Sequence, residues 1–122
     1  MKKTRILLIE DNRLLREGIT TTINGQPDLR VVAASSGNNV MPQARRVKPD
    51  VVLMDLGLRN QNGLRVMASI NRELPEIKVI GLGLIPSQVD IIELVEAGAS
   101  GFVLKDSTVK DFLRTILHHP GT

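Results

Sequence analysis

Short apolar runs alternate with amphipathic stretches along this chain. Runs rich in Ile, Val and Leu predict strands that are buried on both faces of a sheet. Five such strands are expected, at residues 6–9, 29–34, 51–54, 77–84 and 101–104. Between them, apolar residues recur at helical spacing and predict five helices. The first helix contains Ile19 and is expected to end near Asn24, and the second is expected at residues 39–47 with Pro42 in its first turn. The apolar pairs that mark the other three are Met67 with Ile70, Ile91 with Leu94 after Pro86, and Phe112 with Ile116.

Regular alternation of strand and helix predicts a parallel sheet with helices on both faces, which is a three-layer α/β fold. Asn24-Gly25 is expected to end the first helix and Gly98 the fourth, and Ser107 is expected to cap the last. The fourth helix is expected to turn a broad apolar face to the core. That face comprises Ile91, Ile92, Leu94 and Val95.

The composition limits the class of protein. A chain of 122 residues is long enough for one domain with a hydrophobic core, and it has no cysteine for a disulfide or a thiolate metal site. Its basic start is followed by an apolar run too short for a signal peptide, so a cytoplasmic location and no membrane contact are expected. The net charge is +3, but the basic residues are scattered and aromatics make up 2%. A solvated surface is therefore favoured over a nucleic-acid patch.

Charged residues follow three of the predicted strands. Glu10 and Asp11 follow the first strand, Asp55 ends the third, and Lys105 follows the fifth. If the first and third strands are neighbours, their carboxyl ends bring three carboxylates together, and these would raise one another's pKa values. Mg²⁺ would compensate that repulsion, because it prefers oxygen ligands, and Lys105 would add a movable positive charge.

Each of these residues also has a plainer interpretation. Asp55 could bond its own loop, Glu10-Asp11-Asn12 could cap the following helix, and Lys105 could be an ordinary surface lysine. Taken together at three strand ends, they favour a functional site. An aspartate beside a metal ion and an ammonium group can attack phosphorus and form an aspartyl phosphate.

Three segments resemble one protein family: ILLIED at 6–11, VVLMDLGLRNQNG at 51–63 and EAGASGFVLKD at 96–106. They are similar to the receiver domains of two-component response regulators, and the resemblance covers essentially the whole chain. It implies the flavodoxin-like (CheY-like) fold, a doubly wound five-stranded parallel sheet in the order 2-1-3-4-5. The FVLKD ending is similar to receivers that precede a LuxR-type helix-turn-helix domain. We expect a receiver domain over 1–118 and the start of a linker or tail at 119–122.

The resemblance implies a role for each site residue. Asp55 would be the phosphoacceptor, and Lys105 would contact the phosphate. Glu10, Asp11, Asp55 and the Gly57 carbonyl would hold Mg²⁺. The implied partners are a histidine kinase or phosphotransfer protein, and possible homodimer formation is also implied. The protein would bind DNA only through an output domain that this sequence does not include. Any enzymatic activity would be limited to autocatalytic phosphoryl transfer to Asp55 and slow autodephosphorylation.

Two departures from the family pattern stand out. Gly83 occupies the place of a Thr or Ser whose hydroxyl, in the family, bonds the phosphoryl oxygen, and Arg59 replaces a proline after the phosphorylation site. Phe102 keeps the family's aromatic switch position, although burial in the core would explain it equally well. An alternative function follows from Gly83. The chain would be a degenerate receiver that acts as an interaction module independently of phosphorylation.

Two other functions of similar topology are disfavoured. An aspartate-nucleophile phosphatase generally carries a second aspartate two residues after the nucleophile, where this chain has Gly57. A flavin or dinucleotide site requires a glycine- or hydroxyl-rich loop after the first strand, whereas this chain has an acidic loop that repels phosphate.

Overall fold

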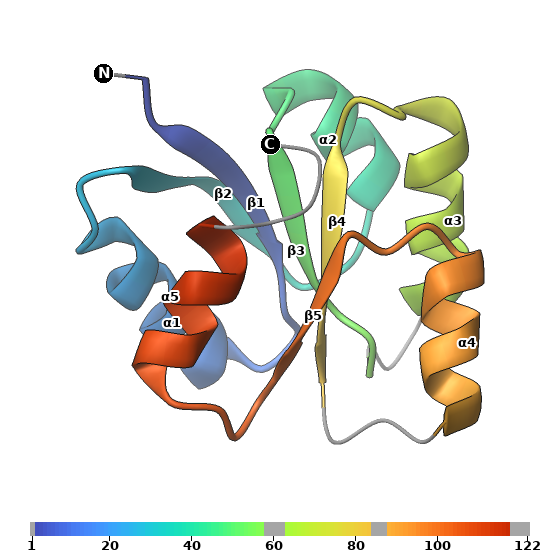
Figure 1. The fold of residues 1–122 in the computed structure, drawn as a ribbon. Helices are drawn as coiled ribbons and strands as arrows, with labels where there is room; N and C mark the ends of the chain where they lie inside the picture. The colour runs from blue at the N-terminus through green and yellow to red at the C-terminus, as the bar shows by residue number, and fades with distance from the viewer. Residues whose placement is uncertain (1, 58–62, 84–87, 118–122) are drawn as a thin grey trace.

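The chain forms a parallel sheet whose strands run in the order β2-β1-β3-β4-β5 (Figure 1). The computed structural model describes residues 2–57, 63–83 and 88–117. In this part of the chain the strands are β1 (Thr4–Ile9), β2 (Leu29–Ser35), β3 (Val51–Asp55), β4 (Lys78–Gly83) and β5 (Gly101–Leu104). The helices are α1 (Arg13–Asn24), α2 (Val40–Val47), α3 (Gly63–Glu73), α4 (Gln88–Glu96) and α5 (Val109–Leu117). The predicted α/β fold and its strand order are confirmed.

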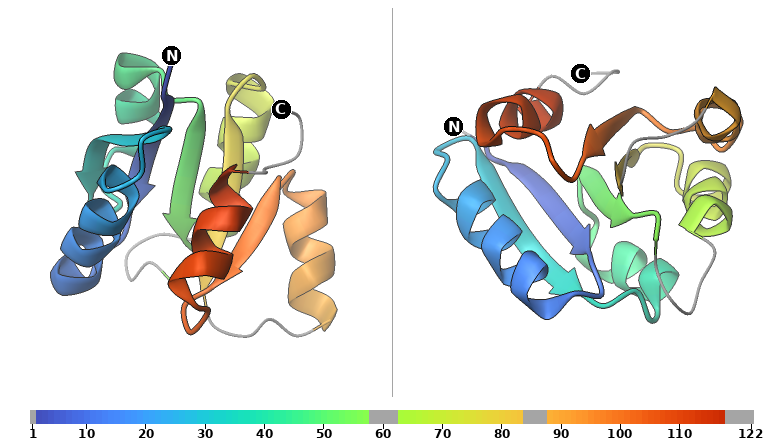
Figure 2. Two further views of the ribbon diagram at one scale, coloured as in Figure 1. Left: turned by 60° about the vertical axis from the view of Figure 1, so that its left-hand side comes forward. Right: turned by 90° about the horizontal axis from the view of Figure 1, so that it is seen from below.

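Helices cover both faces of the sheet. Figure 2 shows α1 and α5 on one face and α2, α3 and α4 on the other. The apolar runs of β1 and β3 lie between these layers, and Ile6–Ile9 and Val51–Met54 are completely buried. Burial of a large aliphatic side chain contributes about 1.5–3 kcal/mol, so these two central strands hold the layers together. Continuous apolar runs are therefore a direct signature of this sheet.

The outer strand β2 carries a bulge. Ile6 of β1 pairs with Val31 and Leu7 pairs with Ala33, so Val32 has no counterpart on β1. A bulge increases the local twist, and on an edge strand it discourages pairing with a further strand.

The cap of the last helix differs from the prediction. The Thr108 hydroxyl oxygen accepts a hydrogen bond from the Asp111 N–H at 3.1 Å, and α5 begins at Val109. The prediction that Ser107 caps this helix is therefore wrong by one residue. Two neighbouring hydroxyl residues satisfy the same sequence rule, and only the entry angle of the chain decides between them.

Helix endings agree with the prediction in one case and differ in geometry in another. Gly98 follows α4 with a φ of +88°, and an added Cβ would lie 2.4 Å from Asn71 Cγ. Glycine therefore suits this position for two reasons. Gly25 ends α1 as predicted, but with a φ of −72°, so it needs no left-handed conformation.

The prediction for the apolar face of α4 is largely wrong. Leu94 is buried, but Ile91, Ile92 and Val95 are 50%, 52% and 71% exposed. Helical spacing of apolar residues shows that they share a face of the helix, but it does not show that the protein's own core covers the whole face.

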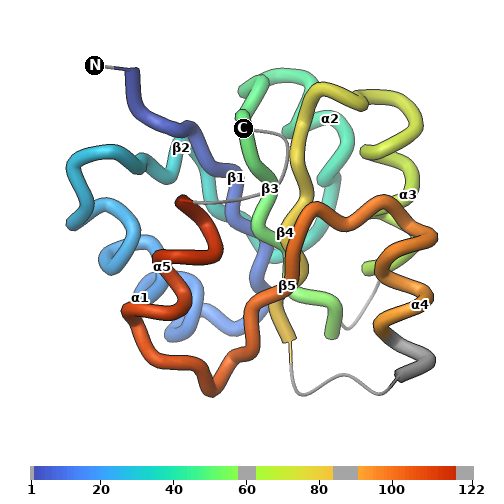
Figure 3. The backbone as a smooth tube through the Cα atoms, viewed as in Figure 1, coloured from blue at the N-terminus to red at the C-terminus, as the bar shows by residue number. Residues whose placement is uncertain are grey.

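Some predicted features lie outside the described residues. They are Arg59 and its loop, Leu84 of the fourth strand, Pro86, and the tail at 119–122. The coloured part of the smooth backbone trace in Figure 3 follows the described course of the chain. In the described part of the chain, every helix is too short or too polar to cross a lipid bilayer.

Candidate functional site

Three carboxylates gather at the carboxyl ends of β1 and β3. Glu10 and Asp11 follow β1, Asp55 is the last residue of β3, and these strands are paired neighbours. One carboxylate oxygen from each of the three residues lies within 4.8 Å of the others. Glu10 is fully buried and Asp55 is 2% exposed, while Asp11 is partly exposed. The convergence expected from the strand ends is therefore present.

Lys105 reaches the same cluster from β5. Its Nζ lies 3.3 Å from Asp55 Oδ1 and 3.6 Å from Glu10 Oε2. Its backbone N–H donates to the Gly83 carbonyl at 2.7 Å, which extends the β4–β5 pairing by one residue and fixes where the side chain starts. The lysine therefore balances two acids at once, and its side chain is 26% exposed.

Backbone groups orient the two buried acids. The Gly57 N–H donates to Asp55 Oδ1 at 2.8 Å, and the Asn12 N–H donates to Glu10 Oε1 at 3.1 Å. Hydrogen bonds from N–H groups to an ionised carboxylate are stronger than those between neutral groups. An added Cβ at position 57 would lie 3.4 Å from Asp55 Oδ1, which is an ordinary van der Waals contact, so a small side chain there would fit beside the acid.

Burial raises the pKa of Glu10, because the charged form loses water. The Asn12 N–H lowers it, the Asp55 charge raises it, Lys105 lowers it, and a hydrogen bond with Asp55 raises it. The net direction of the Glu10 pKa is upward, with burial as the main cause and repulsion from Asp55 as a smaller contribution.

The cluster fits a hard divalent cation. Glu10 Oε2 is buried and has no hydrogen-bond partner among the described residues, although Lys105 lies nearby. Such an unsatisfied oxygen, next to two further carboxylates, matches the oxygen ligands that Mg²⁺ takes in proteins. Glu10, Asp11 and Asp55 would hold the ion. The acidic cluster is thus consistent with the predicted metal site.

Gly83 and Phe102 form a second feature at the ends of β4 and β5. A Cβ added to Gly83 would lie 3.5 and 3.6 Å from two carbons of the Phe102 ring. At Gly81 an added Cβ would lie 3.0 Å from Leu56 and 3.2 Å from the same ring. The half-buried ring therefore lies beside both glycines. A Thr or Ser side chain at position 83 would project next to this ring.

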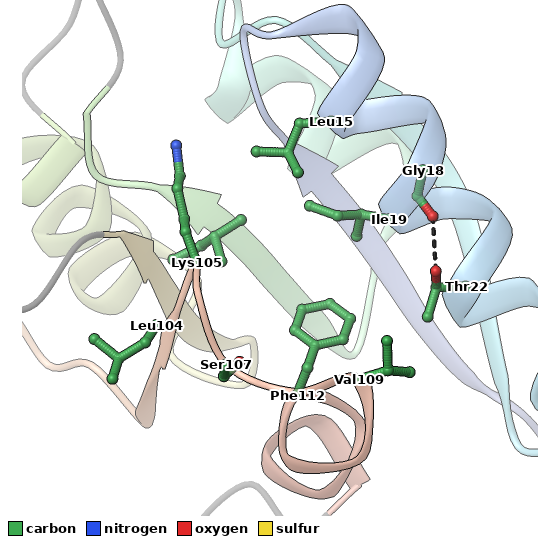
Figure 4. A pocket seen from close by; sticks show the side chains of 10 residues that line it. Leu15, Gly18, Ile19, Thr22, Leu104, Lys105, Ser107, Val109 and Phe112 are labelled. Atoms are coloured by element: carbon green, nitrogen blue, oxygen red, sulfur yellow. Dashed lines mark hydrogen bonds between the residues drawn. The ribbon is translucent and has the colours of Figure 1, made fainter.

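An apolar groove borders the site on its α1–α5 side. It has a volume of about 240 Å³ and runs between Leu15 and Ile19 of α1 and Val109 and Phe112 of α5. Figure 4 shows Lys105 at one end of this groove, with its ammonium group directed away from the Phe112 ring. The lysine thus lies at the edge of the groove, with its tip held by Asp55 and Glu10.

Of two residues that support the site, the sequence indicated Asn12 as part of a possible helix cap, Glu10-Asp11-Asn12, but gave no sign of the role of Arg16. The Asn12 side-chain oxygen accepts from the Leu15 N–H at 2.9 Å, so it caps α1 while its own N–H holds Glu10. Arg16 donates from NH1 to the Glu10 carbonyl at 2.8 Å. The expected cap is thus present at Asn12, whereas Arg16 carries no motif that would single it out.

Comparisons with known proteins agree on one family. The family model for the response regulator receiver domain matches residues 6–117. The response regulator protein VraR of Staphylococcus aureus (strain Mu3 / ATCC 700698) is 31% identical over 108 residues, which cover 88% of this chain and 52% of VraR. The chain therefore spans about half the length of the curated relatives it matches.

Two solved structures are similar over nearly the whole chain. A two-component response regulator of the LuxR family from Aurantimonas sp. SI85-9A1 is 27% identical with a TM-score of 0.88, covering 95% of this chain and 84% of that chain. A DNA-binding response regulator of the LuxR family from Staphylococcus aureus is 25% identical with a TM-score of 0.85, covering 93% of this chain and 96% of that chain.

Proposed function

Because the chain belongs to the family of response regulator receiver domains, we propose that it accepts a phosphoryl group on Asp55 from a histidine kinase or a phosphotransfer protein. The observation that carries this proposal is the juxtaposition of Asp55, Glu10, Asp11 and Lys105 at neighbouring strand ends. A buried carboxylate beside further acids and an ammonium group is poorly explained by stability alone.

The transfer is an in-line displacement at phosphorus. An Asp55 oxygen forms a bond to phosphorus while the bond from phosphorus to the donor's imidazole nitrogen breaks, and that nitrogen keeps the electron pair. The Gly57 N–H holds the attacking carboxylate in place before the donor arrives. Lys105, already 3.3 Å from Asp55 Oδ1, then contacts the transferred phosphoryl oxygens. Mg²⁺ bound by Glu10, Asp11, Asp55 and the Gly57 carbonyl would neutralise charge on the phosphoryl group.

The output of this receiver lies in another domain. The similar regulator from Staphylococcus aureus is described as DNA-binding and of the LuxR family, and VraR is about twice as long as the segment matched here. We therefore propose that residues 1–118 are the receiver, that 119–122 begin a linker, and that the phosphorylated state regulates transcription through a DNA-binding output domain.

Phosphorylation of Asp55 is tested by intact mass. After treatment with acetyl phosphate and Mg²⁺, the protein should gain the mass of one phosphoryl group, and Asp55→Asn should gain none. Asp28→Asn, at an exposed aspartate, is the matched control and should behave like the unchanged protein. An equal mass gain in Asp55→Asn would overturn the proposal.

A second candidate function is an interaction module whose conformation does not respond to phosphate. Gly83 favours it, because this residue offers no hydroxyl to a phosphoryl oxygen and the Phe102 ring lies 3.5 Å from the place that a Cβ at position 83 would take. A hydrogen bond to a charged group contributes about 1.5–3 kcal/mol, so its absence would weaken coupling between the phosphoryl group and α4 roughly ten- to a hundred-fold.

Gly83→Thr separates the two candidates, with Gly83→Val as the control of equal shape. Under the second candidate, beryllofluoride with Mg²⁺ leaves the NMR shifts of α4 and β5 unchanged in the unmodified protein and in Gly83→Val, but moves them in Gly83→Thr. Large shifts in the unmodified protein would contradict the second candidate and favour the first.

A further inference from the structure

A cluster of positive charge lies at the end of the sheet opposite the acidic site. Lys2, Lys3 and Arg5, at the start of the chain and of β1, line one concave surface of about 580 Å³ together with Arg30 of β2. Arg5 and Arg30 are direct partners across the two strands. The fold thus gathers cations that are separated by 25 residues in the sequence, and the scattering on which the expectation of a merely solvated surface depended does not hold for these four residues.

These cations are only partly compensated within the protein. Like charges directly opposite each other on a sheet are destabilising. Arg5 donates from NH1 to the Lys48 carbonyl at 2.6 Å, and its backbone N–H donates to Asp50 Oδ2 at 2.8 Å. Lys2, Lys3 and Arg30 take part in no ion pair among the described residues. An external anion would therefore stabilise this surface.

The lining favours a phosphate backbone over other anionic partners. Among the described residues, Val32 is the single apolar one in the lining. So small an apolar area does not suit insertion into a membrane interface or an apolar contact with a protein. Aromatic side chains, on which single-stranded bases stack, are absent from the lining. The bulge at Val32 also opposes addition of a strand from a partner. The remaining basis for recognition is positive charge, which the phosphates of duplex DNA attract regardless of base sequence.

We propose that the surface formed by Lys2, Lys3, Arg5 and Arg30 contacts the phosphate backbone of duplex DNA. The choice of DNA rests on the output domain proposed above. Figure 1 shows that α5 runs back toward the end of the sheet at which β1 begins. A domain attached after α5 would therefore be joined toward the end of the sheet that carries these cations.

The test measures binding to a random-sequence 20-base-pair duplex by fluorescence anisotropy at several salt concentrations. Each phosphate contact contributes about 0.9 to the slope of log K against log salt concentration. The combined change Lys2→Gln, Lys3→Gln and Arg30→Gln should therefore reduce the slope by about 2 to 3. The charge-retaining change Lys2→Arg, Lys3→Arg and Arg30→Lys should preserve it.

The matched control removes three charges elsewhere. The combined change Arg13→Gln, Lys110→Gln and Arg114→Gln alters exposed residues of α1 and α5 and should leave the slope unchanged. Equal loss in both triple variants, no binding at 50 mM salt, or patch-dependent binding to phosphatidylglycerol vesicles instead of DNA would each overturn the inference. Phosphorylation by acetyl phosphate should be normal in the Lys2, Lys3 and Arg30 variant, so failure to bind DNA is distinguishable from failure of the Asp55 chemistry.

Discussion

Glu10 is a residue whose position costs the fold stability. It is fully buried, its Oε2 has no hydrogen-bond partner among the described residues, and burial raises its pKa. The folded state therefore holds the Glu10 proton more tightly than the unfolded state does. In the absence of metal, this contribution to stability is fully present below the ordinary pKa of glutamate and is lost as pH rises through the raised value.

Glu10→Gln should remove this pH dependence. At neutral pH without metal, the variant should be more stable by on the order of 1 kcal/mol, because a neutral amide replaces a buried charge. Urea unfolding of both proteins from pH 4 to pH 8 measures the effect as a difference curve. Glu96→Gln, at an exposed residue of α4, is the control and should show a flat difference. A flat difference for Glu10→Gln as well would contradict the argument.

At the scale of the element, the start of α5 depends on one hydroxyl group. Thr108 accepts the Asp111 N–H, and Ser107 instead donates its backbone N–H to the Leu104 carbonyl at 3.1 Å. Removing a side-chain cap typically destabilises a protein by about 0.5–2 kcal/mol. The cap bears on the site because Lys105 lies in the segment that connects β5 to α5.

Thr108→Ala should therefore lower the free energy of unfolding by about 1 kcal/mol, as measured by urea denaturation. Ser107→Ala removes a neighbouring hydroxyl of the same kind and should have less than half that effect. If the serine variant were the more destabilised of the two, the cap would lie at position 107, as the sequence alone suggested.

At the scale of the whole molecule, the acidic cluster would couple the binding of a divalent cation to folding. Its ligands come from two strands whose sequence separation exceeds 40 residues, and they meet only when the sheet forms. A ligand that binds only the folded state stabilises it by about 2.7 kcal/mol at a hundred times its dissociation constant.

Mg²⁺ should therefore raise the melting temperature in a concentration-dependent way, and EDTA should reverse the effect. Asp11→Asn should abolish most of the increase, because one of the three carboxylates is lost. Glu76→Gln, which removes an exposed acid after α3, should keep the full response. Equal Mg²⁺ responses in the two variants would show that the ion acts elsewhere.

Much of this molecule follows from local patterns. The strands are predictable because a segment buried on both faces must be apolar throughout, and Ile6–Ile9 and Val51–Met54 are. The acids were identifiable because parallel strands place their carboxyl ends at one edge of the sheet. The apolar spacing of α4 was equally clear in the sequence, yet three of its residues face outward.

The sequence by itself determined the order of strands and helices along the chain and the residues of the acidic site. Both follow from short patterns, which are the apolar spacing within an element and the charged residues at the end of a strand. The tertiary structure decided the partial burial of α4, the cap at Thr108, the packing of Phe102 over Gly83, and the meeting of Arg5 with Arg30. Each of these depends on the angle at which an element enters the fold or on contacts between distant segments. Such contacts exist only once the layers have packed, so no local pattern of residues encodes them.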